Sequence, residues 1–134
     1  DGFHKTSVTP SKQDKIDTEL GIKTLKTLSN LDIGQSVIVS DGYVLGIEAA
    51  EGTDNLIRRC ESLRKNNKGG VLVKMAKLGQ DMRLDLPTIG PDTIFYLAKH
   101  GYNGLAVEKS GVIIVKPIEV ITLLNKSDLF ISYF

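Results

Sequence analysis

The stretch that decides the fold is SVIVSDGYVLGIEAAEGTD, residues 36–54. Two runs rich in β-branched and apolar residues, 36–39 and 43–49, flank the pair Asp41-Gly42, and this arrangement is a strong signal for a β-hairpin. Glu51-Gly52-Thr53-Asp54 follows the second run and is typical of a turn that starts a helix. The sequence therefore predicts a hairpin whose second strand leads directly into a helix.

Outside this stretch, helix and strand patterns alternate along the chain. Three further helices are expected, one from Thr9-Pro10 to about Leu28, one beginning at Gly90-Pro91 and one beginning at Pro117, because proline is favoured at the first helical position. Gly70 to Ala76 has the composition of a buried strand. Further strands are expected at 82–86, 104–108, 112–116 and 129–134. This alternation predicts an α/β fold, a layered sandwich on a mixed β-sheet with helices packed on it.

Composition places the chain among ordinary globular proteins. Its 134 residues suggest one domain, with residues 9–134 as a single α/β domain and residues 1–8 as a flexible linker. There are 17 Lys and Arg against 16 Asp and Glu, a balance that argues against a dedicated nucleic-acid binder. The sequence has no apolar run long enough to span a bilayer. Its single cysteine, Cys60, favours a reducing compartment.

Polar residues gather after two of the predicted strands. The strands that end near Ala50 and Ala76 are each followed by a dense polar segment. In open α/β sheets, ligands bind beyond the carboxyl ends of the strands. We therefore expect the two segments to be neighbours and to form the functional site.

The first polar segment is Glu51-Gly52-Thr53-Asp54. Gly52 allows a sharp turn and a close approach to a ligand, and Thr53 can cap the helix, so the helix N-terminus could seat a phosphate. Arg58 and Arg59, one turn further along, could reach an oxyanion, and Glu51 or Asp54 could hold a hard cation. The alternative is an ordinary strand-to-helix turn with a Thr or Asp cap.

The second polar segment contains Lys74, Lys77, Gln80, Asp81, Arg83 and Asp85. If the backbone is extended from 81 to 86, the side chains of Asp81, Arg83 and Asp85 point to one side. Two carboxylates at this spacing can share a divalent metal ion, or one can activate a water while the other holds the metal. The arginine between them can neutralise phosphate charge. The alternative is the solvated face of a surface strand.

A third segment, LPTIGPDT at residues 86–93, combines two prolines and a glycine within five positions. Such a rigid turn into a helix would place a second anion-facing helix end beside the first, and simple turn chemistry is the alternative. A zinc site is not expected, because neither His4 nor His100 stands at metal-ligand spacing with Cys60. Patterns of serine hydrolases, P-loop NTPases and dinucleotide-binding proteins do not occur.

From about Pro10 to Phe134, the chain resembles the carboxyl-terminal domain of the UDP-2,3-diacylglucosamine pyrophosphatases of the LpxI type. Four stretches carry the resemblance: DIGQ at 32–35, IEAAEGTD at 47–54, the pair Arg58-Arg59, and the run from 70 to 93 that contains QDMRLDLPTIG at 80–90. EGTD alone is a weak motif, but together with the second motif at this distance it is highly specific. Leu78 stands where the family often has proline.

The resemblance implies a cytoplasmic enzyme at the inner face of the Gram-negative inner membrane. Such an enzyme hydrolyses UDP-2,3-diacylglucosamine to UMP and 2,3-diacylglucosamine 1-phosphate (lipid X), with Mg2+ or Mn2+ as cofactor. The resemblance further implies that the enzyme is a homodimer and that its site lies between this domain and an amino-terminal one. We expect the amino-terminal domain to be missing here, residues 1–8 to be the linker from it, and the isolated domain to have little or no activity.

The resemblance also assigns roles to residues. It implies that Asp81 and Asp85 bind the metal ion and that Asp81, Arg83 and Asp85 are catalytic. Substrate contacts are implied for Glu51, Gly52, Thr53, Asp54, Arg59, Lys74, Lys77, Gln80, Thr88 and Gly90. Two hypotheses follow: a metal-dependent nucleotide-lipid pyrophosphatase, or a non-catalytic module that binds a nucleotide or a phosphoglycolipid.

Overall fold

The computed structural model describes residues 4–31, 34–76 and 86–134, in which helices and strands alternate as the sequence predicts. In chain order they are α1 (Lys12–Leu28), β1 (Ser36–Ser40), β2 (Tyr43–Ile47), α2 (Thr53–Arg59), two short 3-10 helices (Glu61–Leu63 and Lys65–Asn67), β3 (Val71–Lys74), β4 (Thr88–Ile89), α3 (Pro91–Lys99), β5 (Gly104–Val107), β6 (Ile113–Ile114), α4 (Pro117–Lys126) and β7 (Phe130–Tyr133).

Five strands form one mixed sheet in the order β2-β1-β3-β5-β7. β1 runs antiparallel to both of its neighbours, whereas β3, β5 and β7 run parallel to one another. The predicted hairpin is formed by β1 and β2, and Asp41 and Gly42 at its turn both have positive φ. β4 and β6 form a separate parallel pair. The predicted α/β class and the mixed sheet are confirmed.

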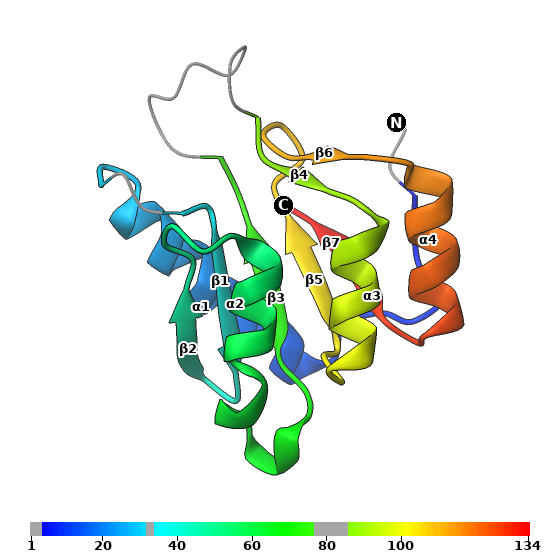
Figure 1. Cartoon of the computed structure of the whole chain (residues 1–134), viewed down its shortest axis with the longest axis horizontal. Coiled ribbons are helices and arrows are strands. Elements are labelled where there is room, and N and C mark those ends of the chain that lie inside the picture. Colours follow the sequence, from blue (N-terminus) through cyan, green and yellow to red (C-terminus); the bar gives the residue numbers. More distant parts are fainter. Residues whose placement is uncertain (1–3, 32–33, 77–85) are drawn as a thin grey trace.

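The sheet lies between two helical layers (Figure 1). α1 packs on β1 and β3 from one side, and α2, α3 and α4 cover the other. Along β3 the side chains alternate between the layers: Val71 and Val73 pack in the cluster that contains Leu25 of α1, and Leu72 packs in the cluster on the opposite face. Because both faces are covered, the central strands are continuous apolar runs.

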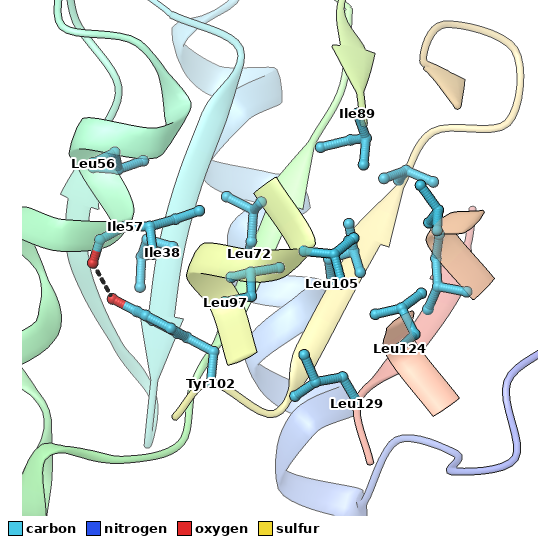
Figure 2. Close-up of a cluster of buried hydrophobic side chains, with 14 of the residues drawn as sticks. Ile38, Leu56, Ile57, Leu72, Ile89, Leu97, Tyr102, Leu105, Leu124 and Leu129 are labelled. Atoms are coloured by element: carbon cyan, nitrogen blue, oxygen red, sulfur yellow. Dashed lines mark hydrogen bonds between the residues drawn. The ribbon is translucent and has the colours of Figure 1, made fainter. Parts of the chain in front are cut away.

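The larger core lies between the sheet and helices α2, α3 and α4 (Figure 2). Leu72 and Leu105 of the sheet pack there with Leu97 of α3. Tyr102 is 2% exposed, and its hydroxyl donates a 2.8 Å hydrogen bond to the carbonyl oxygen of Ile57. Burial raises the pKa of this phenol, so the hydroxyl stays protonated and remains a donor.

The start of α1 differs from the prediction. The helix begins at Lys12 rather than at Pro10, because Ser11 is its N-cap. The Ser11 hydroxyl accepts from the Asp14 amide at 3.0 Å, and the Asp14 carboxylate accepts from the Ser11 amide at 2.9 Å. This reciprocal capping box satisfies two backbone donors at the start of the helix.

Of two further predicted strands, one is shorter than expected and the other lies outside the described residues. The strand expected at 112–116 is only Ile113–Ile114, and it pairs with β4 rather than with β5, the strand just before it in the chain. The reason is that both neighbouring places beside β5 are taken, by β3 and by β7. The strand expected at 82–86 lies outside the described residues.

Residues 4–8, within the segment predicted to be a linker, lie along β7, an edge strand of the sheet. The Ile131 amide donates to the Thr6 hydroxyl at 3.2 Å, and the Tyr133 hydroxyl donates to the His4 carbonyl oxygen at 2.8 Å. These bonds occupy polar groups that an uncovered edge strand would expose. A linker to another domain stays a prediction.

Candidate functional site

One edge of the sheet gathers the predicted site residues. Because β2, β3, β5 and β7 run in the same direction, their carboxyl ends meet at this edge, the upper one in Figure 1. The start of β1 lies there too, with Ser36 opposite Lys74. α2 begins at the same edge, where Thr53 of the first polar segment contacts Lys74 of the second. The fold thus brings the two segments together.

Lys74, the last residue of β3, is a buried cation with 8% of its surface exposed. Its Nζ donates to the Thr53 hydroxyl oxygen at 3.1 Å and to the Thr88 carbonyl oxygen at 2.9 Å, which joins α2, β3 and β4 at one point. Burial lowers the pKa of this ammonium, and the charges of Glu48 and Asp54 act in the opposite direction. Among the described residues, no carboxylate lies within ion-pair distance of Nζ.

Thr53 does not cap α2, and that prediction is wrong. The N-cap is Gly52, which has φ of 88° and makes no side-chain cap hydrogen bond, and such a backbone is accessible mainly to glycine. The Thr53 hydroxyl bonds to side chains of other segments instead of to a backbone amide of α2. It lies 3.1 Å from Ser36 Oγ and donates to Glu48 Oε1 at 3.2 Å, in addition to its bond from Lys74.

Asp54 joins the first turns of two helices. Its Oδ1 accepts a 2.9 Å hydrogen bond from the hydroxyl of Thr93, which is buried in α3. Its negative charge also opposes the lowering of the Lys74 pKa. Asp54 therefore fixes the start of α3 against α2 and adds to the electrostatics of the site.

The two arginines of the first segment have protein partners. Arg59 Nε and Nη2 donate to the two carboxylate oxygens of Glu51 at 2.9 and 2.8 Å. The Arg59 hydrogen bond is the main cause that lowers the pKa of Glu51, and the same bond raises the pKa of Arg59. Arg58 donates to the Tyr96 hydroxyl at 2.6 Å, and its guanidinium lies 4.5 Å from the centre of that ring. A ligand would have to compete with these contacts or add to them.

A groove of about 390 Å3 adjoins the buried lysine, and it is lined by Thr88, Gly90, Pro91, Asp92, Thr93, Val115, Lys116 and Glu119. Thr88 and Gly90 are two of the predicted substrate contacts. Larger hollows of about 580 and 500 Å3 lie at the opposite edge of the sheet, around the β1–β2 turn, and no residue that lines them is a predicted site residue. The smaller groove is the better candidate, because it lies at the carboxyl edge beside the hydrogen bond from Lys74 to Thr88.

Comparison with known proteins identifies the family. The family model of the LpxI C-terminal domain matches residues 3–132. The chain belongs to the LpxI C-terminal domain family. It is 35% identical over 130 residues to UDP-2,3-diacylglucosamine pyrophosphatase LpxI of Caulobacter vibrioides. That match covers 92% of this chain and 46% of the relative, so the chain spans about half the relative's length.

A solved structure shares the fold of this LpxI-family domain. The dCMP deaminase from the cyanophage S-TIM5, in its apo form, superimposes with a TM-score of 0.53 at 12% sequence identity. The match covers 87% of this chain and 96% of the deaminase chain. At this identity the likeness concerns the fold alone, since one fold supports unrelated activities.

The other predicted site residues of this LpxI-family domain lie outside the described residues: Lys77, Gln80, Asp81, Arg83 and Asp85. In the described part, no group of three or more His, Cys, Asp or Glu side chains is placed to hold a metal ion. Glu48 and Asp54 supply the carboxylates whose charges act on Lys74. Carboxylate oxygens are the ligands that Mg2+ and Mn2+ prefer, so the donor chemistry of Asp81 and Asp85 fits such an ion.

Sequence reasoning missed Ser36, Glu48 and Thr93. The sequence did contain a signal for Ser36 and Glu48. With the turn at Asp41-Gly42, antiparallel pairing brings the start of the first strand to the end of the second, and the Glu48 amide donates to the Ser36 carbonyl oxygen at 2.9 Å. Thr93 gave no such signal, because its bond to Asp54 depends on how α2 and α3 pack.

Proposed function

We propose that this domain belongs to a hydrolase that cleaves the pyrophosphate bond of UDP-2,3-diacylglucosamine, giving UMP and 2,3-diacylglucosamine 1-phosphate (lipid X). The name of the 35% identical relative supports the substrate. The observation that carries the proposal is Lys74, a buried cation at the carboxyl edge of the sheet next to a groove. An ammonium shielded from bulk water attracts a phosphate more strongly than an exposed one.

The proposed reaction consumes one water molecule. The water oxygen bonds one phosphorus as the bridging P–O bond breaks, the bridging oxygen leaves on the other phosphorus with the electron pair of that bond, and a proton is released. Negative charge develops on the bridging and non-bridging oxygens, so catalysis depends on cations held in position. Lys74, Lys77 and Arg83 are proposed to offset this charge.

Other residues are proposed to shape the substrate seat. Glu51, Gly52 and Asp54 lie in the loop and first turn of α2 beside Lys74, and Thr88 and Gly90 line the groove. Arg59, the last residue of α2, bonds to Glu51. Gln80 is proposed to act with them. Thr53 contributes in a different way, since its hydroxyl accepts a hydrogen bond from Lys74 and is already engaged by protein groups.

Mg2+ or Mn2+ is the proposed cofactor, with Asp81 and Asp85 as its ligands. When bound, such an ion polarises phosphoryl oxygens and offsets their charge. One of the two carboxylates is proposed to accept the proton of the attacking water, and Arg83, between them, to hold a phosphate through its two-pronged guanidinium.

The setting of the enzyme is proposed from its substrate and its family. A glycolipid with two acyl chains is reached at a membrane surface, so we infer action at the cytoplasmic face of the Gram-negative inner membrane. None of the helices in the described part has the length and apolar character needed to cross a bilayer. A homodimer whose amino-terminal domain completes the site is part of the same proposal.

Incubation of the full-length protein that contains this domain with UDP-2,3-diacylglucosamine and Mg2+ should release UMP, measured by chromatography. We expect Asp85→Ala to lower the rate at least about hundredfold. Glu19→Ala, at an exposed position of α1, should retain the rate of the parent protein. Turnover by Asp85→Ala equal to that of the parent would remove the role given to Asp85.

Absence of UMP from the intact protein would contradict the hydrolase proposal. The alternative, a non-catalytic module for a nucleotide or a phosphoglycolipid, would then be measured by calorimetric titration with UMP and with lipid X.

A further inference from the structure

Glu48 follows β2 and is held closely against the start of β1. Its amide donates to the Ser36 carbonyl oxygen at 2.9 Å, and its carbonyl oxygen accepts from the Gly34 amide at 2.9 Å. Gly34 has no room for a side chain, because an added Cβ would lie 2.6 Å from the Glu48 Cβ. The backbone of Glu48 is thus fixed before its carboxylate makes any contact.

The hydrogen bonds around Thr53 have only one consistent direction when Glu48 is ionised. A carboxylate only accepts and an ammonium only donates, so the Thr53 hydroxyl gives its proton to Glu48 Oε1 and receives one from Lys74 Nζ. The remaining lone pair then accepts from Ser36 Oγ, which lies 3.1 Å away. Glu48 therefore takes the single hydroxyl proton of Thr53, which leaves both lone pairs of that oxygen for Lys74 and Ser36.

We propose that Glu48 is a positioning residue of this site: it orients the Thr53 hydroxyl and, through that hydroxyl, holds the Lys74 ammonium in place for the anionic group of the substrate. The inference rests on the proposed function, because it takes Lys74 to bind the pyrophosphate. Glu48 touches neither the groove lining nor Nζ within hydrogen-bond distance, so it acts through Thr53.

The charge of Glu48 adds a second effect. Burial lowers the pKa of Lys74, and among the described residues the charges of Glu48, after β2, and Asp54, in α2, counteract this. Ser36 of β1, Thr53 of α2 and Thr88 of β4 surround the ammonium as neutral groups. Removal of the Glu48 charge should therefore lower the pKa of Lys74 further, because a charge that opposes the effect of burial is lost.

The first test needs no substrate. The 134-residue chain, labelled with 13C at lysine Cε, is titrated by NMR as the parent, as Glu48→Gln and as Glu19→Gln, with Lys74→Arg to assign the signal. The pKa of Lys74 should fall in Glu48→Gln and stay unchanged in Glu19→Gln. Equal values in Glu48→Gln and the parent would overturn the proposal. Thermal unfolding midpoints of each variant establish that the folded proteins are compared.

The second test uses turnover by the full-length protein. Glu48→Gln should lower kcat/KM by about tenfold, as expected for one charge-assisted hydrogen bond, and move the alkaline limb of its pH profile to lower pH. Thr53→Val should cause a similar loss. The double variant should lose no more than the larger single effect, because Glu48 acts through Thr53.

The outcomes separate this inference from the function on which it rests. Additive losses in the double variant, or an unchanged pH profile in Glu48→Gln, would overturn the role of Glu48 while leaving the hydrolase intact. A parent protein without turnover would contradict the proposed function, and with it the role of Glu48 toward the substrate, even where the lysine titration gives the expected shift.

Discussion

Lys74 is the described residue on which we expect the proposed activity to depend most. Lys74→Met removes its charge and keeps much of its length. We expect kcat/KM to fall about hundredfold, the loss typical of one donor to a developing oxyanion. The free energy of unfolding of Lys74→Met should equal or exceed that of the parent, because folding no longer has to remove a charged ammonium from water. Steady-state kinetics and urea unfolding measure the two effects, with Lys99→Met, at an exposed position of α3, as the control.

Lys74 also predicts how the activity depends on pH. The pKa of Lys74 is lowered by burial, so its charged form is lost at lower pH than that of an exposed lysine. Activity that needs the cation should decline as pH rises through this lowered value. A profile whose alkaline limb is the same in the parent and in Lys74→Met would show that another group titrates there.

Gly90 allows a test of close approach by the substrate. Its backbone, φ −130° and ψ −177°, suits any residue, and an added Cβ would lie 3.8 Å from the Val115 Cβ, an ordinary contact. Gly90→Ala should therefore keep the unfolding free energy within about 0.5 kcal/mol of the parent. Because Gly90 lines the groove, the methyl group should lower kcat/KM by about tenfold or more.

The matched comparison for Gly90 is Gly52→Ala. Gly52 has φ of 88°, so alanine there should destabilise by about 1 kcal/mol or more through backbone strain. If Gly90→Ala loses stability as Gly52→Ala does, its effect on turnover does not report substrate contact.

At the scale of the elements, α1 shows how packing overrides helix propensity. Gly21 faces the sheet so closely that an added Cβ would lie 2.6 Å from Val73 Cγ2. Alanine gains about 1 kcal/mol of helix propensity, whereas overpacking costs about 1–3 kcal/mol. We therefore expect Gly21→Ala to be destabilising in chemical denaturation. Thr27→Ala, exposed in the last turn of α1, should be neutral or stabilising, and a stabilised Gly21→Ala would contradict the close packing.

Elements were predictable where local chemistry decides them. Asp41-Gly42 specified the hairpin, and Pro91 and Pro117 marked the starts of α3 and α4. The pairing of β4 with β6 was not predictable, because each has only two residues and their partnership depends on the placement of β3, β5 and β7.

In the candidate site too, features that depend on nearby residues were predictable, and features that depend on the packing of distant elements were not. The expectation that the two polar segments are neighbours is confirmed for Lys74, which bonds to Thr53, although the strand predicted at 70–76 ends at Lys74 itself. The orientation of Thr53 could not be predicted from its neighbours in sequence alone, since it depends also on Ser36 and Lys74, which belong to two other strands. A helix start offers threonine a local partner, but a buried ammonium offers it a stronger one.

At the scale of the whole molecule, the size of the groove predicts what the 134-residue chain can do alone. The groove has a volume of about 390 Å3, near the lower limit for a drug-sized ligand, whereas the proposed substrate carries a nucleotide, a sugar and two acyl chains. The chain also corresponds to 46% of its relative. We expect it to unfold cooperatively, because it has covered sheet faces and two cores. We also expect it to hydrolyse the UDP-lipid at less than about one hundredth of the full-length rate, since an amino-terminal domain is proposed to complete the site and to position the substrate. Differential scanning calorimetry and UMP release, measured on the same preparations of both proteins, test the two parts. Full-length rates from the 134-residue chain would mean that the described edge of the sheet, with Lys74 and its neighbours, needs no second domain for catalysis.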